Sequence, residues 1–94
     1  MSPSKRKYWD VEESQVFRDQ ANELFPNPGH QDKTLEGVTW VLARNPYEGK
    51  ETDQEGVWAI PTDAWPSSKA VTIYYRIEER SVTLLGIRES PEIT

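Results

Sequence analysis

A regular two-residue alternation over residues 70–87, AVTIYYRIEERSVTLLGI, constrains this fold more than any other feature of the chain. Its first half places β-branched and aromatic residues on one side of an extended chain: Val71, Ile73, Tyr75 and Ile77. Such alternation is typical of a strand with one buried face. A second apolar run, residues 81–87, follows directly. The segment therefore predicts two consecutive strands.

Residues 79–80, a Glu-Arg dipeptide, separate the two runs and predict a hairpin. A two-residue loop at this point pairs apolar residues on one face of the two strands: Ile77 with Val82, and Tyr75 with Leu84. That register is the one that an antiparallel hairpin with a single buried face needs. The dipeptide lacks the Asn-Gly or Asp-Gly pattern of tight turns, so the loop length stays open. We expect this hairpin at the centre of a sheet.

The first half of the chain predicts two helices that pack on this sheet. Residues 14–24 have an apolar stripe at helical spacing, formed by Val16, Phe17, Ala21 and Leu24. Residues 25–29, FPNPG, end this helix because proline cannot continue one. Residues 32–45 predict the second helix, with Asp32 as its N-cap. Its expected apolar face consists of Leu35, Val38, Val41 and Leu42, with Trp40 to one side.

The remaining segments predict short strands and loops. Residues 8–11 and 56–60 are expected to be strands, and the acidic residues 47–55 are expected to be an exposed loop. The element order is then strand, helix, helix, strand, strand, strand. This order predicts a single α+β domain over residues 1–94, with a flexible tail at residues 1–4. In it, a two-helix hairpin packs on one face of a mostly antiparallel sheet.

The composition excludes several kinds of chemistry. The chain has no cysteine, which excludes disulfides, thiol catalysis and cysteine zinc sites. Its one histidine, His30, has no second ligand candidate nearby, so we expect neither a metal nor a cofactor. No apolar run approaches the roughly 20 residues that span a bilayer, and we expect a cytoplasmic protein without membrane contact. The net charge of −5 argues against tight binding to nucleic acid, where a basic face is usual.

Two kinds of side chain have alternative interpretations. Three of the four tryptophans can be interpreted in two ways: Trp40, Trp58 and Trp65. If they are buried, they belong to the core, and if they are exposed, they offer a surface for contact with another protein. Arg88 is either a functional cation or a partner in a surface ion pair with Glu89 or Glu92.

Several segments together resemble the RelE/ParE superfamily of toxins from type II toxin–antitoxin systems. The segment YWDV, residues 8–11, followed by an amphipathic helix, is similar to the opening of the family. LARNP, residues 42–46, is similar to the end of its second helix. IYYRI, residues 73–77, followed by a polar turn, an apolar strand and Arg88, is similar to its last hairpin. The resemblance covers most of the chain and implies the same α+β fold.

The resemblance also implies which residues to test for activity. RelE-type members cut mRNA in the ribosomal A site, using lysines, arginines and a tyrosine or histidine to stabilise charge and move a proton. Arg88 matches the arginine that follows the last strand of the family. The other family positions fall at uncharged residues of this chain: Ala59, Pro61, Thr72 and, approximately, Thr94. The cations that remain to join Arg88 are Arg76, Lys69 and Lys50.

Three functions are therefore compared. The first is a toxin-like component that binds a cognate antitoxin, with the nuclease site mostly lost and docking positions at Trp40, Trp58 and Trp65. The second is an active mRNA endoribonuclease with an unusual site around Arg88. The third is a non-enzymatic protein-interaction domain unrelated to toxins. For the first two, the resemblance implies ribosome-bound mRNA or, as in ParE-like members, DNA gyrase as the target.

Overall fold

The computed structural model describes residues 8–62 and 70–90 of the chain, apart from the side chains of residues 28, 30, 31 and 34. Its elements in chain order are β1 (Asp10–Glu13), α1 (Gln15–Leu24), α2 (Pro28–Arg44), the 3₁₀ helix η1 (Pro46–Glu48), β2 (Lys50–Glu51), β3 (Trp58–Thr62), β4 (Val71–Ile77) and β5 (Ser81–Glu89). The strands form one sheet in the order β1-β5-β4-β3-β2. Strand β1 runs parallel to β5, and the other neighbours are antiparallel.

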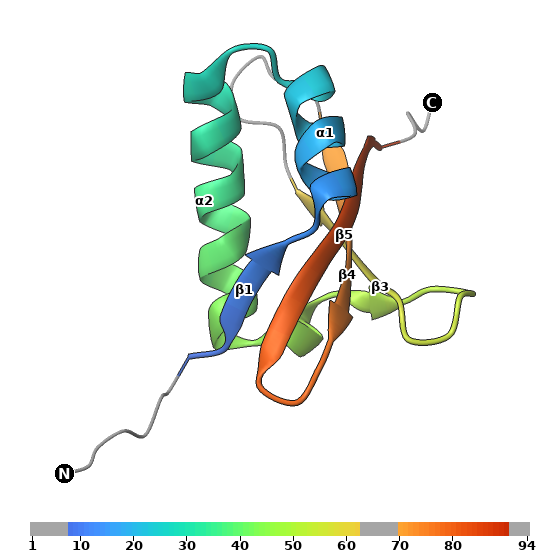
Figure 1. Ribbon diagram of the computed structural model, residues 1–94. Coiled ribbons are helices and arrows are strands. Elements are labelled where there is room, and N and C mark those ends of the chain that lie inside the picture. Colours follow the sequence, from blue (N-terminus) through green and yellow to red (C-terminus); the bar gives the residue numbers. More distant parts are fainter. Residues whose placement is uncertain (1–7, 63–69, 91–94) are drawn as a thin grey trace, which may run out of the picture.

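Both helices cover the same face of this sheet. Figure 1 shows α1 and α2 running in opposite directions, with α1 beside β5. The core lies between the helices and the sheet and draws side chains from both layers: Phe17, Ala21, Phe25, Val38, Leu42, Ile60, Val71, Ile73, Tyr75, Val82, Leu84 and Ile87. The predicted α+β architecture is therefore confirmed, with β2 as an additional short strand.

The β4–β5 hairpin has the predicted register. The structure confirms both expected pairs: Ile77 with Val82, and Tyr75 with Leu84. The backbone N–H of Glu78 donates a hydrogen bond to the carbonyl oxygen of Ser81 at 2.7 Å, which closes a loop of two residues. The alternation of apolar side chains set this register, since a slip by one residue would turn every one of them toward solvent.

A β-bulge interrupts the hairpin beyond this point. Tyr75 lies opposite Leu84 but Tyr74 lies opposite Gly86, so β5 contains one extra residue. The extra residue returns Ile87 to the core face, where it is buried. Helix α1 stabilises this irregularity, because Gln20 Oε1 accepts a hydrogen bond from the Ile87 backbone N–H at 2.9 Å.

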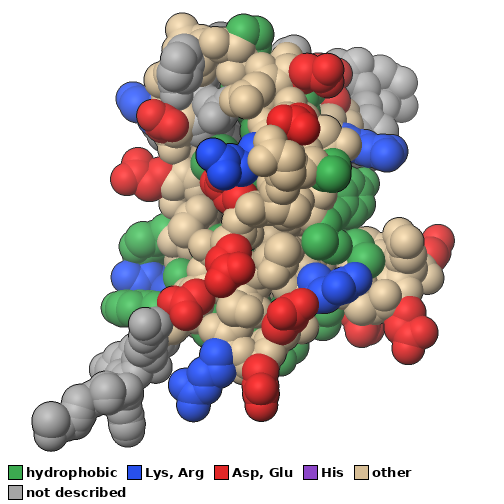
Figure 2. Space-filling model, in the orientation of Figure 1, with side chains coloured by type: hydrophobic (Ala, Val, Ile, Leu, Met, Phe, Trp, Pro, Cys, Tyr) green, Lys and Arg blue, Asp and Glu red, His purple; other side chains and the backbone are tan. Residues whose placement is uncertain are grey.

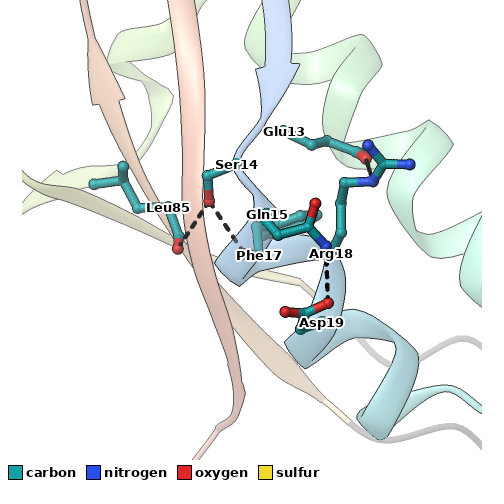
Figure 3. A network of polar contacts seen from close by, with 7 residues as sticks. All are labelled: Glu13, Ser14, Gln15, Phe17, Arg18, Asp19 and Leu85. Carbon is teal, nitrogen blue, oxygen red and sulfur yellow. Dashed lines mark hydrogen bonds and ion pairs between the residues drawn. The ribbon is translucent and has the colours of Figure 1, made fainter.

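Helix α1 begins at a serine cap. Ser14 Oγ accepts a hydrogen bond from the Phe17 backbone N–H at 3.1 Å and donates one to the Leu85 carbonyl oxygen at 3.4 Å (Figure 3). Phe17 and Ala21 are buried against the sheet. Val16, which the sequence placed in the apolar stripe, is 57% exposed, so that part of the prediction is wrong. The buried row follows Phe17 and Ala21, and Val16 lies about 100° away around the helix.

Helix α2 begins at Pro28 rather than at Asp32. Proline is favoured in the first turn, where its missing N–H is not needed. Asn27 Oδ1 accepts a hydrogen bond from the Gly29 backbone N–H at 2.8 Å and so caps the helix. The prediction of Asp32 as the N-cap is wrong, and this carboxylate lies one turn inside the helix. The expected buried positions Val38 and Leu42 are confirmed.

The prediction of a loop over residues 47–55 is wrong in its first half, which contains η1 and β2. The predicted exposure is confirmed there for Tyr47, Glu48, Lys50 and Glu51. The Tyr75 hydroxyl on β4 donates a hydrogen bond to the Pro46 carbonyl oxygen at 2.7 Å. The same hydroxyl accepts one from the Gly49 backbone N–H at 3.1 Å. Strand β2 then pairs with β3. This polar segment is therefore held against the edge of the sheet.

Two further strands lie slightly later in the chain than predicted, β1 at Asp10–Glu13 and β3 at Trp58–Thr62. Strand β3 contains Pro61, which removes one backbone donor. Strand β2 pairs only with Trp58 and Ala59 of β3. Within the described residues, β3 is therefore an edge strand at Pro61, and proline is tolerated there.

Candidate functional site

The sheet face opposite the helices carries most of the residues that the sequence proposed for catalysis. On β4, Thr72, Tyr74 and Arg76 alternate with buried core residues and therefore point away from the helices. Pro61 on β3 lies opposite Thr72, and Thr72 lies opposite Arg88 on β5. Pro61, Thr72 and Arg88, one residue from each of three neighbouring strands, thus form one row across this open face.

This row coincides with positions where the resemblance places the catalytic residues of the family. Pro61 and Thr72 occupy two of those positions, and Arg88 supplies the charge of the row. Beside Arg88, Thr72 Oγ1 and Ser90 Oγ are hydrogen-bonded at 2.8 Å. The Arg88 guanidinium can donate hydrogen bonds to an anion, and so can whichever of the two hydroxyls accepts the bond between them. One cation, however, balances little of the charge that develops at a reacting phosphate.

The other candidate cations lie away from this row. Arg76 is opposite Thr83, four residues along β4 from Thr72, which corresponds to a backbone separation of about 13 Å. Lys50 is on β2, separated from β5 by β3 and β4. Lys69 lies outside the described residues. Over residues 8–62 and 70–90, the candidate cations are therefore spread across the sheet, and their catalytic role stays a prediction.

The ion-pair alternative for Arg88 has two expected partners. Arg88 and Glu89 are adjacent on β5 and therefore point to opposite faces of the sheet, which disfavours a pair between them. Glu92, the other expected partner, lies outside the described residues, and that pairing stays a prediction. No three histidine or acidic side chains among the described residues are placed to hold a metal ion. The described helices include none with the length and apolar character of a membrane-spanning segment.

Trp40 lies on the surface near the end of α2. It is 59% exposed, so core packing does not account for it. The Arg44 guanidinium carbon lies 3.9 Å from the centroid of the Trp40 ring and 4.8 Å from that of Tyr8. Arg44 Nη1 also donates a hydrogen bond to the Tyr8 hydroxyl at 3.3 Å. The arginine thus holds two exposed aromatic rings in place through cation–π contacts.

Trp58 lies at the boundary between core and surface. Its ring stacks on Tyr75 at 6.4 Å between centroids and meets the edge of Tyr47 at 5.4 Å. Tyr47, which is 56% exposed, also contacts Trp9 at 6.2 Å. Trp58 is therefore partly a core residue and partly the base of an exposed aromatic surface. Trp65 lies outside the described residues, and its role stays a prediction.

Tyr75 is a buried phenol with a structural role. Burial raises the pKa of Tyr75 above its ordinary value of 10.0, and the carboxylate of Glu48 raises it further. The hydrogen bond from the Gly49 N–H acts in the opposite direction. The hydroxyl thus stays protonated near neutral pH and holds the segment after α2 against the sheet.

A groove of about 840 Å³ lies between α1 and α2. Its floor is formed by Phe17 and Ala21 of α1 and by Leu35 of α2. Polar and charged residues with one aromatic line its rim: Glu13, Arg18, Asn22, Asp32, Glu36, Thr39 and Trp40. Figure 2 shows several acidic side chains on this helix-bearing face.

The sequence did not reveal this groove, although one signal pointed to it. Asp32, Glu36 and Trp40 recur every fourth residue and therefore lie along one side of α2. This row runs next to the buried positions Val38 and Leu42. It therefore lies at the boundary between the buried side of α2 and its solvent-exposed side. The width of the groove depends on how the two helices sit on the sheet, which local spacing does not determine.

No protein-family model and no curated protein matches the chain. Among solved structures, the chain is similar to one chain of the RelBE2 toxin–antitoxin complex from Mycobacterium tuberculosis, with a TM-score of 0.69 and 19% sequence identity. The likeness covers 94% of this chain and 98% of that chain. Because the two folds agree over almost their whole lengths, this protein has the fold of RelE-type toxins.

Proposed function

We propose that this protein is a toxin-like subunit of a toxin–antitoxin module, that it binds a cognate antitoxin in the cytoplasm, and that its ribosome-dependent nuclease site is mostly lost. The fold supports this proposal, since the similar RelBE2 chain belongs to a toxin–antitoxin complex. Fold alone does not specify activity, so the proposal depends on the surfaces of this chain.

The observation that carries the proposal is the contrast between two surfaces. The open sheet face has one cation, Arg88, in the row where the family resemblance places several. The other side of the molecule exposes aromatic rings at Tyr8, Trp40 and Tyr47. Exposed aromatic side chains are typical of protein interfaces, and Trp and Tyr are enriched among the residues that dominate binding. The chain is thus better equipped to hold a protein than to cleave a phosphodiester.

A pull-down of the tagged full-length chain from its native host, followed by mass spectrometry, tests this function. We expect a small protein encoded by a neighbouring reading frame to copurify. Capture of ribosomes or of DNA gyrase would identify the target class instead. A captured protein unrelated to antitoxins would support the alternative of a non-enzymatic interaction domain and would contradict our proposal.

A double substitution tests the aromatic surface. Trp40→Ala with Tyr47→Ala removes two exposed rings, and we expect it to weaken copurification of the antitoxin. Thr83→Ala on the open face is the matched control, since that face is not assigned to the antitoxin. If copurification of the antitoxin falls equally in both variants, or in neither, the exposed rings of Trp40 and Tyr47 do not bind the antitoxin.

An active mRNA endoribonuclease remains the second candidate, because Arg88 lies beside the hydrogen-bonded hydroxyls of Thr72 and Ser90. It predicts translation-dependent mRNA cleavage that Arg88→Ala abolishes. Arg18→Ala on α1, which is not among the candidate catalytic cations, serves as the control. We expect no cleavage by the wild-type chain on translating ribosomes. Cleavage that depends on Arg88 would establish the nuclease instead.

A further inference from the structure

We propose that Gln20 is a positioning residue that acts on Arg88 through the β-bulge of β5. From the helix side of the sheet, Gln20 fixes the place of the bulge and so keeps the Arg88 guanidinium on the open face, beside Thr72. This inference goes beyond the proposed function, because it concerns how the open face is built and does not depend on an antitoxin.

The bulge decides which face of the sheet Arg88 occupies. Val82 and Leu84 are fully buried on the core face, so an unbroken two-residue repeat would place Arg88 on that face too. The extra residue in β5 instead buries Ile87 and turns Arg88 to the open face, opposite Thr72. The position of this cation is therefore set by a single irregularity in the strand.

The apolar pattern of β5 requires a bulge but does not locate it. Burial of both Leu84 and Ile87 needs one extra residue between them, and either Leu85 or Gly86 could supply it. In the structure Tyr74 lies opposite Gly86, so Leu85 is the extra residue. Because a bulge bends its strand and increases the local twist, its position decides where the side chains beyond it point.

Helix α1 holds the bulge at this position through two side chains. Strand β1 ends partway along β5, and α1 contacts β5 beyond that point. The Ile87 backbone N–H donates a hydrogen bond to Gln20 Oε1 at 2.9 Å, whereas Ser14 Oγ lies 3.4 Å from the Leu85 carbonyl oxygen. Ile87 is buried, so its N–H is costly to leave without an acceptor. Gln20 thus makes the shorter of the two bonds, directly beside Arg88.

Gly86 leaves the space that Gln20 needs. A Cβ at residue 86 would lie 2.9 Å from Gln20 Oε1, which is too close for both atoms to keep their places. Apart from Gln20 and the chain neighbours of Gly86, the described residues place nothing within 4 Å of that Cβ. The glutamine on α1 and the glycine on β5 are therefore a matched pair.

Nuclear magnetic resonance of the ¹⁵N,¹³C-labelled full-length chain tests the inference. Gln20→Leu removes the acceptor, and we expect it to weaken the cross-strand nuclear Overhauser contacts between Thr72 and Arg88 at least about twofold. The contacts between Tyr75 and Leu84, which precede the bulge, should not change. Gln20→Glu keeps an acceptor oxygen and should restore the wild-type contacts.

Two results would overturn the proposal. If amide hydrogen exchange at Ile87 accelerates in Gln20→Leu while the contacts between Thr72 and Arg88 stay intact, Gln20 only stabilises the strand. The matched control is Gln15→Leu on the same helix, where Gln15 Nε2 donates a hydrogen bond to Asp19 on the exposed side. Equal weakening in Gln15→Leu would show a general effect of α1 rather than the contact with the bulge.

Gly86→Ala tests the same contact from the side of the strand. The added methyl group should displace the Gln20 amide and weaken the contacts between Thr72 and Arg88, as Gln20→Leu does. In the double variant the two effects should not add, because both substitutions remove one interaction. Fully additive effects would show that Gly86 and Gln20 act independently and would overturn the proposal.

Inorganic phosphate tests whether the position of Arg88 matters for binding an anion. At low ionic strength we expect phosphate to shift the Arg88 side-chain signals saturably, with an affinity about threefold lower in Gln20→Leu. Gly49→Ala, which overpacks a different part of the sheet, is the control for a general loss of stability. Equal weakening in Gly49→Ala and Gln20→Leu, or no response of Arg88 in the wild type, would overturn the positioning role.

Discussion

Tyr75 connects the sheet to the segment that follows α2. Its side chain is fully buried, and its hydroxyl bonds to both Pro46 and Gly49. A hydroxyl in the core needs such partners, because a buried polar group without a hydrogen bond is costly. The same contact positions Tyr47, which lies between Pro46 and Gly49 and carries part of the exposed aromatic surface.

Tyr75→Phe should lower the free energy of unfolding by about 1–3 kcal/mol, because the buried carbonyl oxygen of Pro46 loses its donor. Urea denaturation followed by fluorescence measures the change. Tyr74→Phe, on the open face of the same strand, is the control and should stay within about 0.5 kcal/mol. A similar small change in both variants would show that the hydroxyl contributes little.

The raised pKa of Tyr75 predicts a loss of stability at alkaline pH. The folded protein holds this proton more tightly than the unfolded chain, whose tyrosines have pKa values near 10.0. The contribution of the protonated hydroxyl is therefore complete below that pH and is lost as the pH rises through the raised pKa. The difference in unfolding free energy between wild type and Tyr75→Phe, measured at increasing pH, should shrink above about pH 10. A constant difference would contradict the shift.

Gly49→Ala should destabilise the protein by about 1–3 kcal/mol through overpacking. A Cβ at Gly49 would overlap the Tyr75 hydroxyl and lie 2.5 Å from the carbonyl oxygen of Ala59, which belongs to the backbone and cannot move freely. Gly37→Ala is the control, since a Cβ there has open space around it. Because Gly37 lies inside α2, its replacement should stabilise by up to about 1 kcal/mol, and thermal unfolding distinguishes the two signs.

Several secondary-structure elements are tied to a neighbour that is distant in sequence. Helix α1 is held to β5 at both Ser14 and Gln20. Strand β1 pairs in parallel with β5, which joins the beginning of the described chain to its end. Strand β5 thus contacts elements from both halves of the chain.

Ser14→Ala should cost about 1 kcal/mol of unfolding free energy, because the Phe17 N–H loses its cap. Chemical denaturation gives the value, and Ser81→Ala at the start of β5 is the matched serine control. Ser14→Asp should retain the cap, since Asp is equally favoured at this position. Failure of Ser14→Asp to restore stability would show that the bond to Leu85, rather than the cap, is what matters.

The charge distribution of the whole molecule opposes binding to RNA. Affinity for nucleic acid comes largely from cations that neutralise phosphates, whereas this chain carries 16 acidic and 11 basic residues. The described cations of the open face, Lys50, Arg76 and Arg88, are separated on the sheet. The described part of the open face therefore offers no continuous basic surface.

The wild-type chain should show no saturable binding to a fluorescent single-stranded RNA at about 0.15 M salt. Fluorescence anisotropy tests this, with the same titration on Arg88→Ala. Micromolar binding that weakens with salt and disappears in Arg88→Ala would favour the nuclease over the antitoxin-binding subunit.

Local patterns in the sequence determined the elements that have one buried face and one exposed face. The period-two alternation of Val71, Ile73 and Tyr75 fixed the hairpin register, because only one register buries all of these side chains. Helical spacing likewise identified Phe17, Ala21, Val38 and Leu42 as core residues. The position of Arg88 on the open face does not follow from this alternation alone, because it depends on the β-bulge in β5.

Tertiary structure alone decided the features that depend on distant contacts. The start of α2 depended on the Asn27 cap, and the order in residues 46–51 depended on the hydroxyl of Tyr75, far away in the chain. The exposure of Trp40 and the acidic groove arise from how two helices sit on one sheet. Hydrophobic periodicity specifies which face of an element is buried, whereas the space left between two elements is set by packing across the whole core.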